Sequence, residues 1–130
     1  MLEDLCRRFR RIAPAVDFCS LRYASEEDEM LSVRQDVLQP VYRATDAGAM
    51  VTVAAGGGMG YAAACDLSEA GLRDAARRAE KWARASAGRC AADPRKVLAG
   101  GAGDPKGEYA GPEQVPWASV GLKEIGRAHV

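Results

Sequence analysis

Histidine is almost absent from this sequence, because the only one, His129, is the second-to-last residue of the chain. A zinc site in a protein takes about four ligands, drawn mainly from closely spaced cysteine and histidine side chains. The cysteines lie far apart and form no Cys-x-x-Cys pair: Cys6, Cys19, Cys65 and Cys90. We therefore expect no metal site within this chain, and no position is assigned as catalytic, cofactor-binding or metal-binding.

Net charge is also lacking, since eighteen Lys and Arg residues balance eighteen Asp and Glu residues. A neutral chain has no long-range attraction for nucleic acid or for an anionic membrane. No apolar run is long enough to span a bilayer, and the N-terminus lacks the continuous apolar segment of a secretory signal. We therefore expect a cytoplasmic protein with reduced cysteines, and neither nucleic acid nor a membrane as its partner.

Large side chains are scarce as well. Aromatic residues make up 6% of the chain, and much of its 48% apolar content is alanine. Because alanine buries little surface, the core should be modest for the size of the chain. The length suits one ordinary domain, or a slightly smaller domain with a tail.

Apolar residues recur at helical spacing near both ends of the first 88 residues. Leu2, Leu5 and Phe9 recur at helical spacing before Pro14, which predicts a first helix that ends ahead of the proline. A second helix should be capped by Asp66 or Ser68, in a sequence at 66–69 with the spacing of a capping box, and should end at Gly88. Its buried stripe is expected to consist of Leu72, Ala75 or Ala76, Ala79, Trp82 and Ala83.

Between the helices, apolar and polar residues alternate in short runs that are broken by turn residues, as in antiparallel strands. Five strands are expected, at residues 16–23, 30–34, 37–45, 49–55 and 59–65. Turns are expected at residues 25–29, 35–36, 46–48 and 56–58. The fourth strand is the most apolar and should be central, and Pro40 predicts an edge position or a bulge in the third. The small residues of the last strand predict a helix packed closely on it.

These patterns predict an α+β fold, in which the N-terminal helix and the long second helix cover an antiparallel sheet of about five strands. We expect the domain to comprise residues 1–88. A loop-rich arm should follow at 89–118, with Tyr109, Val115 and Trp117 as isolated apolar anchors. Residues 119–124 would begin a further helix that is cut short.

Three polar stretches have both a structural and a functional interpretation. Arginines cluster on the first helix, at Arg7, Arg8, Arg10 and Arg11. A solvated face near the helix C-terminus is favoured over a nucleic-acid patch, because no aromatic residues are interleaved with them. The carboxylates at 26–29 are favoured as a charged turn over a metal or acid–base site. The glycines at 56–58 are favoured as a hairpin turn over a phosphate loop, because a strand rather than a helix follows them.

Five short sequences follow one another along the chain: LSVR (31–34), VLQPV (37–41), DAGAMVTV (46–53), GYA (60–62) and DLSEAGL (66–72). Taken in order, they resemble the N-terminal domain of the TldD/PmbA family of metallopeptidases, once described as modulators of DNA gyrase. The resemblance covers about residues 16–87 and, more loosely, 107–124. One departure is local: members often have a glycine in the turn where this chain has Gln35 and Asp36.

The resemblance implies a function for a longer parent protein. In that family a His-Glu-x-x-x-His motif, in the later part of a much longer chain, binds zinc, and its glutamate is suited to activate a water molecule. That motif is absent from these residues, so no site residue is carried over. The parent would be a cytoplasmic hydrolase that acts in proteolysis of peptides, as a homo- or hetero-oligomer. This chain would be its non-catalytic N-terminal fragment and inactive alone.

Two alternatives belong to other classes. The parent could be a metal-free partner subunit of a heteromeric protease of this family, which lacks the zinc motif. Or the chain could be a small stand-alone module that binds a peptide as an added strand at an exposed sheet edge.

The last seven residues suggest a different origin. Residues 124–130 are what GAG ATC GGA AGA GCA CAC GTN encodes, and from its second base that string is the start of a common sequencing adapter. We expect residues 125–130 to be translated adapter, so that His129 has no biological role; the rival interpretation is a genuine short protein that ends in a frayed helix.

Overall fold

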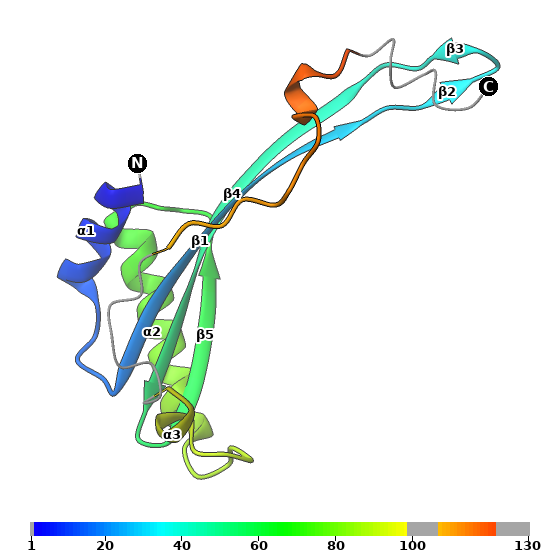
Figure 1. Ribbon diagram of the computed structural model, residues 1–130. Coiled ribbons are helices and arrows are strands. Elements are labelled where there is room, and N and C mark those ends of the chain that lie inside the picture. Colours follow the sequence, from blue (N-terminus) through cyan, green and yellow to red (C-terminus); the bar gives the residue numbers. More distant parts are fainter. Residues whose placement is uncertain (1, 99–106, 122–130) are drawn as a thin grey trace. The chain divides into compact units, whose positions relative to one another are not determined.

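The computed structural model describes residues 2–98 and 107–121. The elements in chain order are α1 (Leu2–Ile12), β1 (Phe18–Met30), β2 (Val33–Arg34), β3 (Val37–Leu38), β4 (Tyr42–Ala55), β5 (Gly58–Ala64), α2 (Glu69–Ser86), α3 (Pro94–Leu98) and the 3-10 helix η1 (Trp117–Ser119). The expected α+β class is confirmed. The five strands are divided over two sheets, however: a three-stranded sheet in the order β1-β4-β5 and a pair formed by β2 and β3 (Figure 1).

The chain divides into two compact units. Unit 1 comprises Met1–Asp28 and Arg43–Ala102, and unit 2 comprises Glu29–Tyr42 and Gly103–Val130. The domain boundaries expected at residues 88 and 118 stay predictions. Residues 125–130, and the second half of the short helix expected at 119–124, lie outside the described residues.

The core of unit 1 lies between one face of the three-stranded sheet and the two long helices. Strands β4 and β5 are antiparallel, with Val51 opposite Ala62 and Val53 opposite Gly60. Leu72 of α2 is fully buried against this face. The remaining core side chains come mostly from α1, β4 and α2: Leu5, Phe9, Ala49, Ala55, Ala75, Ala76, Ala79 and Ala83. The central position expected for residues 49–55 is confirmed, because β4 is the middle strand.

Helix α2 lies unusually close to β5, as the small residues of that strand predict. A Cβ placed on Gly58 would overlap the carbonyl oxygen of Ala83, and one placed on Gly60 would overlap that of Ala79. Both neighbours are backbone atoms, which cannot rotate away. Glycine at these two positions therefore sets the distance between the helix and the strand.

The start of α2 is fixed by local hydrogen bonds, and of the two expected caps it is Ser68, not Asp66, that is the N-cap, so the capping box expected at 66–69 does not form. The backbone N–H of Gly71 donates to Ser68 Oγ at 3.2 Å, which makes Ser68 the N-cap. The backbone N–H of Ser68 in turn donates to Asp66 Oδ1 at 2.9 Å. That hydrogen bond to the charged form lowers the pKa of the Asp66 carboxyl.

Two expected turns are wrong. Residues 25–29 lie within β1, and residues 46–48 lie within β4. Adjacent carboxylates in a strand point alternately to opposite faces, so their repulsion is relieved without a turn. The turn composition of Asp46-Ala47-Gly48 is overridden by pairing in the sheet; Asp46 Oδ1 instead accepts the N–H of Ala47 at 2.9 Å.

The buried stripe expected for α2 is confirmed except at Trp82, whose side chain is 64% exposed. Alanines occupy the buried positions around it because α2 lies too close to β5 for a large ring. The short helix α3 was not expected, since its five residues follow loop-like composition. Asp93 begins it by accepting the N–H of Arg95 at 3.0 Å.

Unit 2 contains the hairpin β2–β3, with Val33 opposite Leu38 and Arg34 opposite Val37. The turn expected at residues 35–36 is confirmed, although it contains no glycine: Gln35 and Asp36 both have positive φ, at 51° and 61°. Positive φ at both central residues is the geometry of a tight primed turn.

Pro40, which has no N–H to donate, lies in the break between β3 and β4. In the same unit, Trp117 Nε1 donates to Glu29 Oε2 at 3.3 Å.

Candidate functional site

The face of the three-stranded sheet that points away from the core is exposed over much of its length, although Ala54 near one end of it is buried. On β5, Tyr61 is 65% exposed and Met59 is also exposed. On β4, Met50 and Thr52 are half-buried, and Thr52 lies directly opposite Tyr61. Because side chains alternate along a strand, these residues share the face opposite Val51 and Val53.

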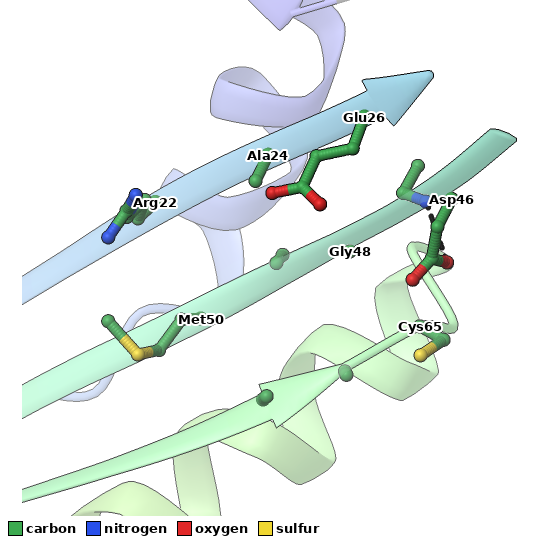
Figure 2. Close-up of a pocket in the computed structure, with 11 residues that line it drawn as sticks. Arg22, Ala24, Glu26, Asp46, Gly48, Met50 and Cys65 are labelled. Atoms are coloured by element: carbon green, nitrogen blue, oxygen red, sulfur yellow. Dashed lines mark hydrogen bonds between the residues drawn. The ribbon is translucent and has the colours of Figure 1, made fainter. Parts of the chain in front are cut away.

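One end of this face is hollowed, with a cavity volume of about 290 Å³. All three strands contribute to its lining: Arg22, Ala24 and Glu26 from β1, residues 46–50 from β4, and residues 63–65 at the end of β5. Figure 2 shows Arg22, Ala24 and Glu26 in a row along β1, with Gly48 and Met50 on the neighbouring strand. The hollow is mainly apolar, with charged groups at Arg22, Glu26 and Asp46.

This arrangement is suited to binding. A small apolar hollow flanked by one guanidinium and two carboxylates can hold an apolar side chain and orient charged neighbours. Within residues 2–98 and 107–121, no group of three or more His, Cys, Asp or Glu side chains could hold a metal ion. The donor set that zinc requires is therefore not offered by the part of the chain that the structure describes.

The two edges of the sheet differ. At the outer edge of β5, Ser86 Oγ of α2 accepts the backbone N–H of Met59 at 3.0 Å and lies 2.9 Å from the carbonyl oxygen of the same residue, to which it can donate. Arg78 Nη2, also from α2, donates to the carbonyl oxygen of Ala63 at 2.9 Å. These side chains occupy the outer backbone groups of Met59 and Ala63, which hinders a further strand from pairing along β5. The other edge is β1, whose only neighbour in this sheet is β4.

No sequence pattern predicts these contacts at the β5 edge. Ser86 and Arg78 look like ordinary surface residues of a helix, and their function depends on how closely α2 approaches β5. Only the glycines Gly58 and Gly60 point to that approach, since they allow the helix backbone to reach the strand.

The glycine-rich stretch at 56–58 forms a hairpin turn. Gly56 and Gly57 form the turn between β4 and β5, and both have positive φ. The backbone N–H of Gly56 donates to Asp17 Oδ2 at 2.8 Å. A carboxylate thus takes the donor that a phosphate loop would offer, so the hairpin interpretation is confirmed. His129 lies outside the described residues.

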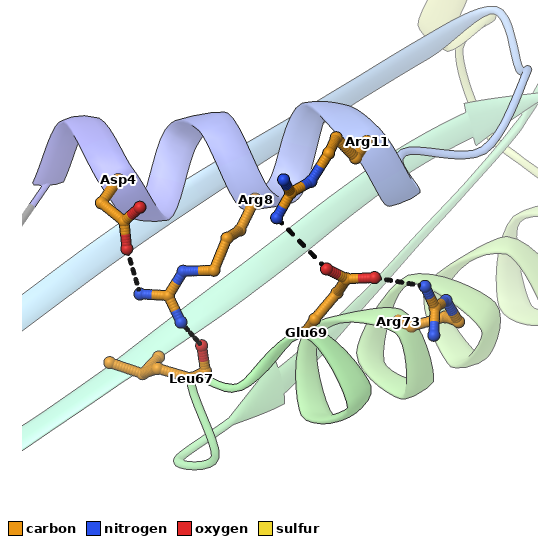
Figure 3. A network of polar contacts seen from close by, with 6 residues as sticks. All are labelled: Asp4, Arg8, Arg11, Leu67, Glu69 and Arg73. Atoms are coloured by element: carbon orange, nitrogen blue, oxygen red, sulfur yellow. Dashed lines mark hydrogen bonds and ion pairs between the residues drawn. The ribbon is translucent and has the colours of Figure 1, made fainter.

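The arginines of α1 do not form a uniform solvated face. Arg8 pairs with Asp4 at 2.9 Å and donates to the carbonyl oxygen of Leu67 at 3.1 Å. Arg11 pairs with Glu69 at 3.3 Å, and Figure 3 shows this carboxylate shared between Arg11 and Arg73. These contacts join α1 to the start of α2. Exposed ion pairs contribute little stability each, so they mainly fix the orientation of α1.

Cys19 on β1 is the least exposed of the four cysteines. It packs against the core, whereas Cys6, Cys65 and Cys90 are exposed. Burial raises the pKa of the Cys19 thiol, and the negative charge of Glu80 raises it further. A raised pKa leaves less thiolate at a given pH, and the thiolate is the reactive form.

We therefore expect Cys19 to be alkylated last of the four cysteines at mildly alkaline pH. Its rate should keep rising with pH beyond the usual pKa of a cysteine thiol, because its own pKa is raised. Peptide mapping after timed exposure to iodoacetamide measures this order, and the same reaction in strong denaturant, where all four should react alike, is the control. Equal rates for Cys19 and Cys65 in the folded chain would contradict the prediction.

In the part of the chain that the structure describes, no helix is both long enough and apolar enough to cross a lipid bilayer.

Comparison with known proteins identifies one family. Residues 19–83 match the family described as PmbA/TldA metallopeptidase domain 1, and this match covers half of the chain. No relative was found among the curated proteins. The match begins at the second residue of β1 and ends in the last turn of α2, so it contains the three-stranded sheet except for Phe18, together with the β2–β3 hairpin. The chain therefore belongs to the PmbA/TldD family of metallopeptidases, and residues 19–83 are the family's first domain.

Proposed function

We propose that this chain is the non-catalytic first domain of a zinc metallopeptidase that cleaves peptides in the cytoplasm. The observation that carries the proposal is the match of residues 19–83 to domain 1 of the family. The donor set of the described residues supports it, because no group among them suits a metal ion. The zinc and the residues that activate water would then belong to a later domain of the parent.

The role we propose for this domain is assembly. The core of unit 1 is closed on one face by α1 and α2, whereas the opposite face carries Met59, Tyr61 and the hollow beside Arg22 and Glu26. A rigid sheet with one uncovered face and one open edge is suited to dock another subunit, which could also wall off an active site. The proposed partners are a peptide substrate for the parent and a second family subunit, identical or different.

Two other assignments are kept as alternatives. The parent could be a metal-free partner subunit of a heteromeric protease. The stand-alone module that adds a peptide strand would use the β1 edge, because Ser86 and Arg78 already bind backbone groups at the β5 edge.

The test has two parts. The purified chain, incubated with Zn²⁺ and a mixture of unstructured peptides, should give no hydrolysis above a blank, while a known zinc peptidase in the same mixture gives turnover. Sequencing the gene past the codon for Glu124 should reveal a continuing frame that reaches His-Glu-x-x-x-His. A continuing frame without that motif would favour the partner subunit. Turnover by the chain itself, or a stop codon directly after Val130, would overturn the proposal.

A further inference from the structure

We propose that two copies of this chain associate by pairing their β1 strands antiparallel around Ala24, so that the three-stranded sheets join into one sheet of six strands. The proposal deepens the assembly role proposed above by naming the surface and the partner. Three observations carry it: α2 side chains that occupy backbone groups at the β5 edge, a β1 edge with no further strand beside it among the described residues, and a charge pattern along β1 that is complementary to itself.

An open strand edge is an association surface. A strand at the end of a sheet presents a row of backbone N–H and carbonyl groups that another strand can take up. Strand β1 has thirteen residues, more than a typical strand. Ser86 and Arg78 of α2 already bind backbone groups on the outer edge of β5, whereas no described strand pairs with the outer edge of β1, so β1 is the edge better suited to a further strand.

The central residue of β1 is Ala24. In an antiparallel pair with its twofold axis at this residue, Arg22 lies opposite the partner subunit's Glu26, and Glu26 lies opposite the partner subunit's Arg22. Ser20 then lies opposite the partner subunit's Asp28. Two ion pairs and two hydroxyl–carboxylate contacts form on one face, and the two small Ala24 side chains meet on the axis.

The side chains that this register uses are available. Arg22, Ala24 and Glu26 are exposed, and Figure 2 shows them on one face of β1. In the described part of the chain, no ion pair joins Arg22 or Glu26 to another residue of the same copy. Pairing would therefore satisfy charges that the single copy leaves in water.

Other pairings fit less well. A parallel, in-register pair would place Glu26 against the partner subunit's Glu26 and Asp28 against the partner subunit's Asp28, and like charges directly opposite each other repel. An antiparallel pair centred on Ser25 would satisfy Arg22 with the partner subunit's Asp28 but would leave Glu26 opposite an alanine. The register centred on Ala24 pairs both Arg22 and Glu26 with opposite charges. The charge pattern therefore favours a second copy of this chain as the partner at the β1 edge.

The first test reverses charge. The full chain should show concentration-dependent dimerisation in sedimentation velocity over a micromolar series. Arg22→Glu and Glu26→Arg should each weaken self-association about tenfold or more, because both facing pairs become repulsive. Mixing the two single variants should restore dimers, since each then faces its opposite charge. The double variant R22E/E26R should also dimerise alone.

Arg7→Glu is the matched control, because Arg7 is an exposed arginine on α1 and the substitution changes net charge by the same amount. It should leave dimerisation unchanged. Circular dichroism confirms that each variant is folded. A wild-type chain that stays monomeric throughout the series, or two single variants that fail to associate when mixed, would overturn the proposal.

The second test fixes the register. Ala24→Cys should form a disulfide between copies under mild oxidation, because the two side chains meet at the axis. Ser25→Cys, on the opposite face, should not cross-link above the background of the native cysteines. Cross-linking through Ser25→Cys alone would refute this register. Failure of pairing leaves the proposed peptidase function standing, whereas hydrolysis by the isolated chain would remove that function and leave the pairing intact.

Discussion

Replacement of Gly60 by alanine is expected to destabilise unit 1 by about 3 kcal/mol or more. The new Cβ would overlap the carbonyl oxygen of Ala79 and lie 2.5 Å from the backbone nitrogen of Ala83. Neither atom can move without shifting α2 away from β5, and that shift would open the core beside Leu72. Because small domains are stable by about 5–15 kcal/mol, the variant should melt far below the wild-type chain or fail to fold.

Gly48→Ala is the control for this prediction. Gly48 lies in β4 of the same sheet, and a Cβ there would be 3.4 Å from the carbonyl oxygen of Ala64, which is ordinary contact. Alanine also loses less conformational entropy than glycine on folding, so this variant should be as stable as wild type or slightly more stable. Urea unfolding followed by circular dichroism measures both. Equal midpoints for Gly60→Ala and Gly48→Ala would show that the close approach of α2 to β5 is not required.

The glycines of β5 show how much of the fold can be predicted from the sequence and how much cannot. Small residues along 60–64 correctly predict a helix packed closely on that strand. Gly58 is assigned by its neighbours to the hairpin turn, yet it begins β5 and lies under α2. The sequence does not distinguish a glycine that a turn requires from a glycine that close packing requires. The position of α2 in the structure makes that distinction.

The errors in the strand assignment have a common physical cause. Residues 25–29 and 46–48 have turn composition, but they lie in two long strands that pair with each other in the sheet. Local propensity is overridden when a neighbouring strand satisfies the backbone groups, and no short window of sequence contains that neighbour. The opposite case is Gln35 and Asp36, where a weak turn signal gave a tight turn with positive φ at both residues.

The candidate site was less predictable than the fold. Arg22 and Glu26 carry no motif, and their significance comes from sharing one face of an edge strand. Ser86 matters because it binds the backbone of Met59, which is distant in sequence. The family resemblance, by contrast, was accessible from short sequences in the right order, and the match of residues 19–83 confirms it. The sequence thus predicts the family of the chain better than it predicts which sheet faces and strand edges are exposed.

Leu72→Ala is expected to have the second large effect, a loss of about 3 kcal/mol within the range of 2–5 kcal/mol seen for such truncations in cores. Leu72 is fully buried, and it is the largest fully buried side chain among the described residues. Most of its buried neighbours on α2 are alanines, which have no spare atoms with which to fill the space that its removal leaves. An alanine-rich core should therefore relax little around the cavity, which places the cost above the lower end of the range.

Trp82→Ala on the same helix supplies the comparison, because the sequence predicts that both residues belong to one buried stripe. Trp82 is 64% exposed, and alanine keeps the Cβ atom that lies over Gly60. Its removal should change the free energy of unfolding by only about 0.5 kcal/mol. Chemical denaturation of the two variants thus tests the packing itself. Equal losses for Trp82→Ala and Leu72→Ala would mean that Trp82 is buried, as the sequence predicts. Helix α2 would then be rotated about its axis, and the contacts of Ser86 and Arg78 with the β5 edge could not form.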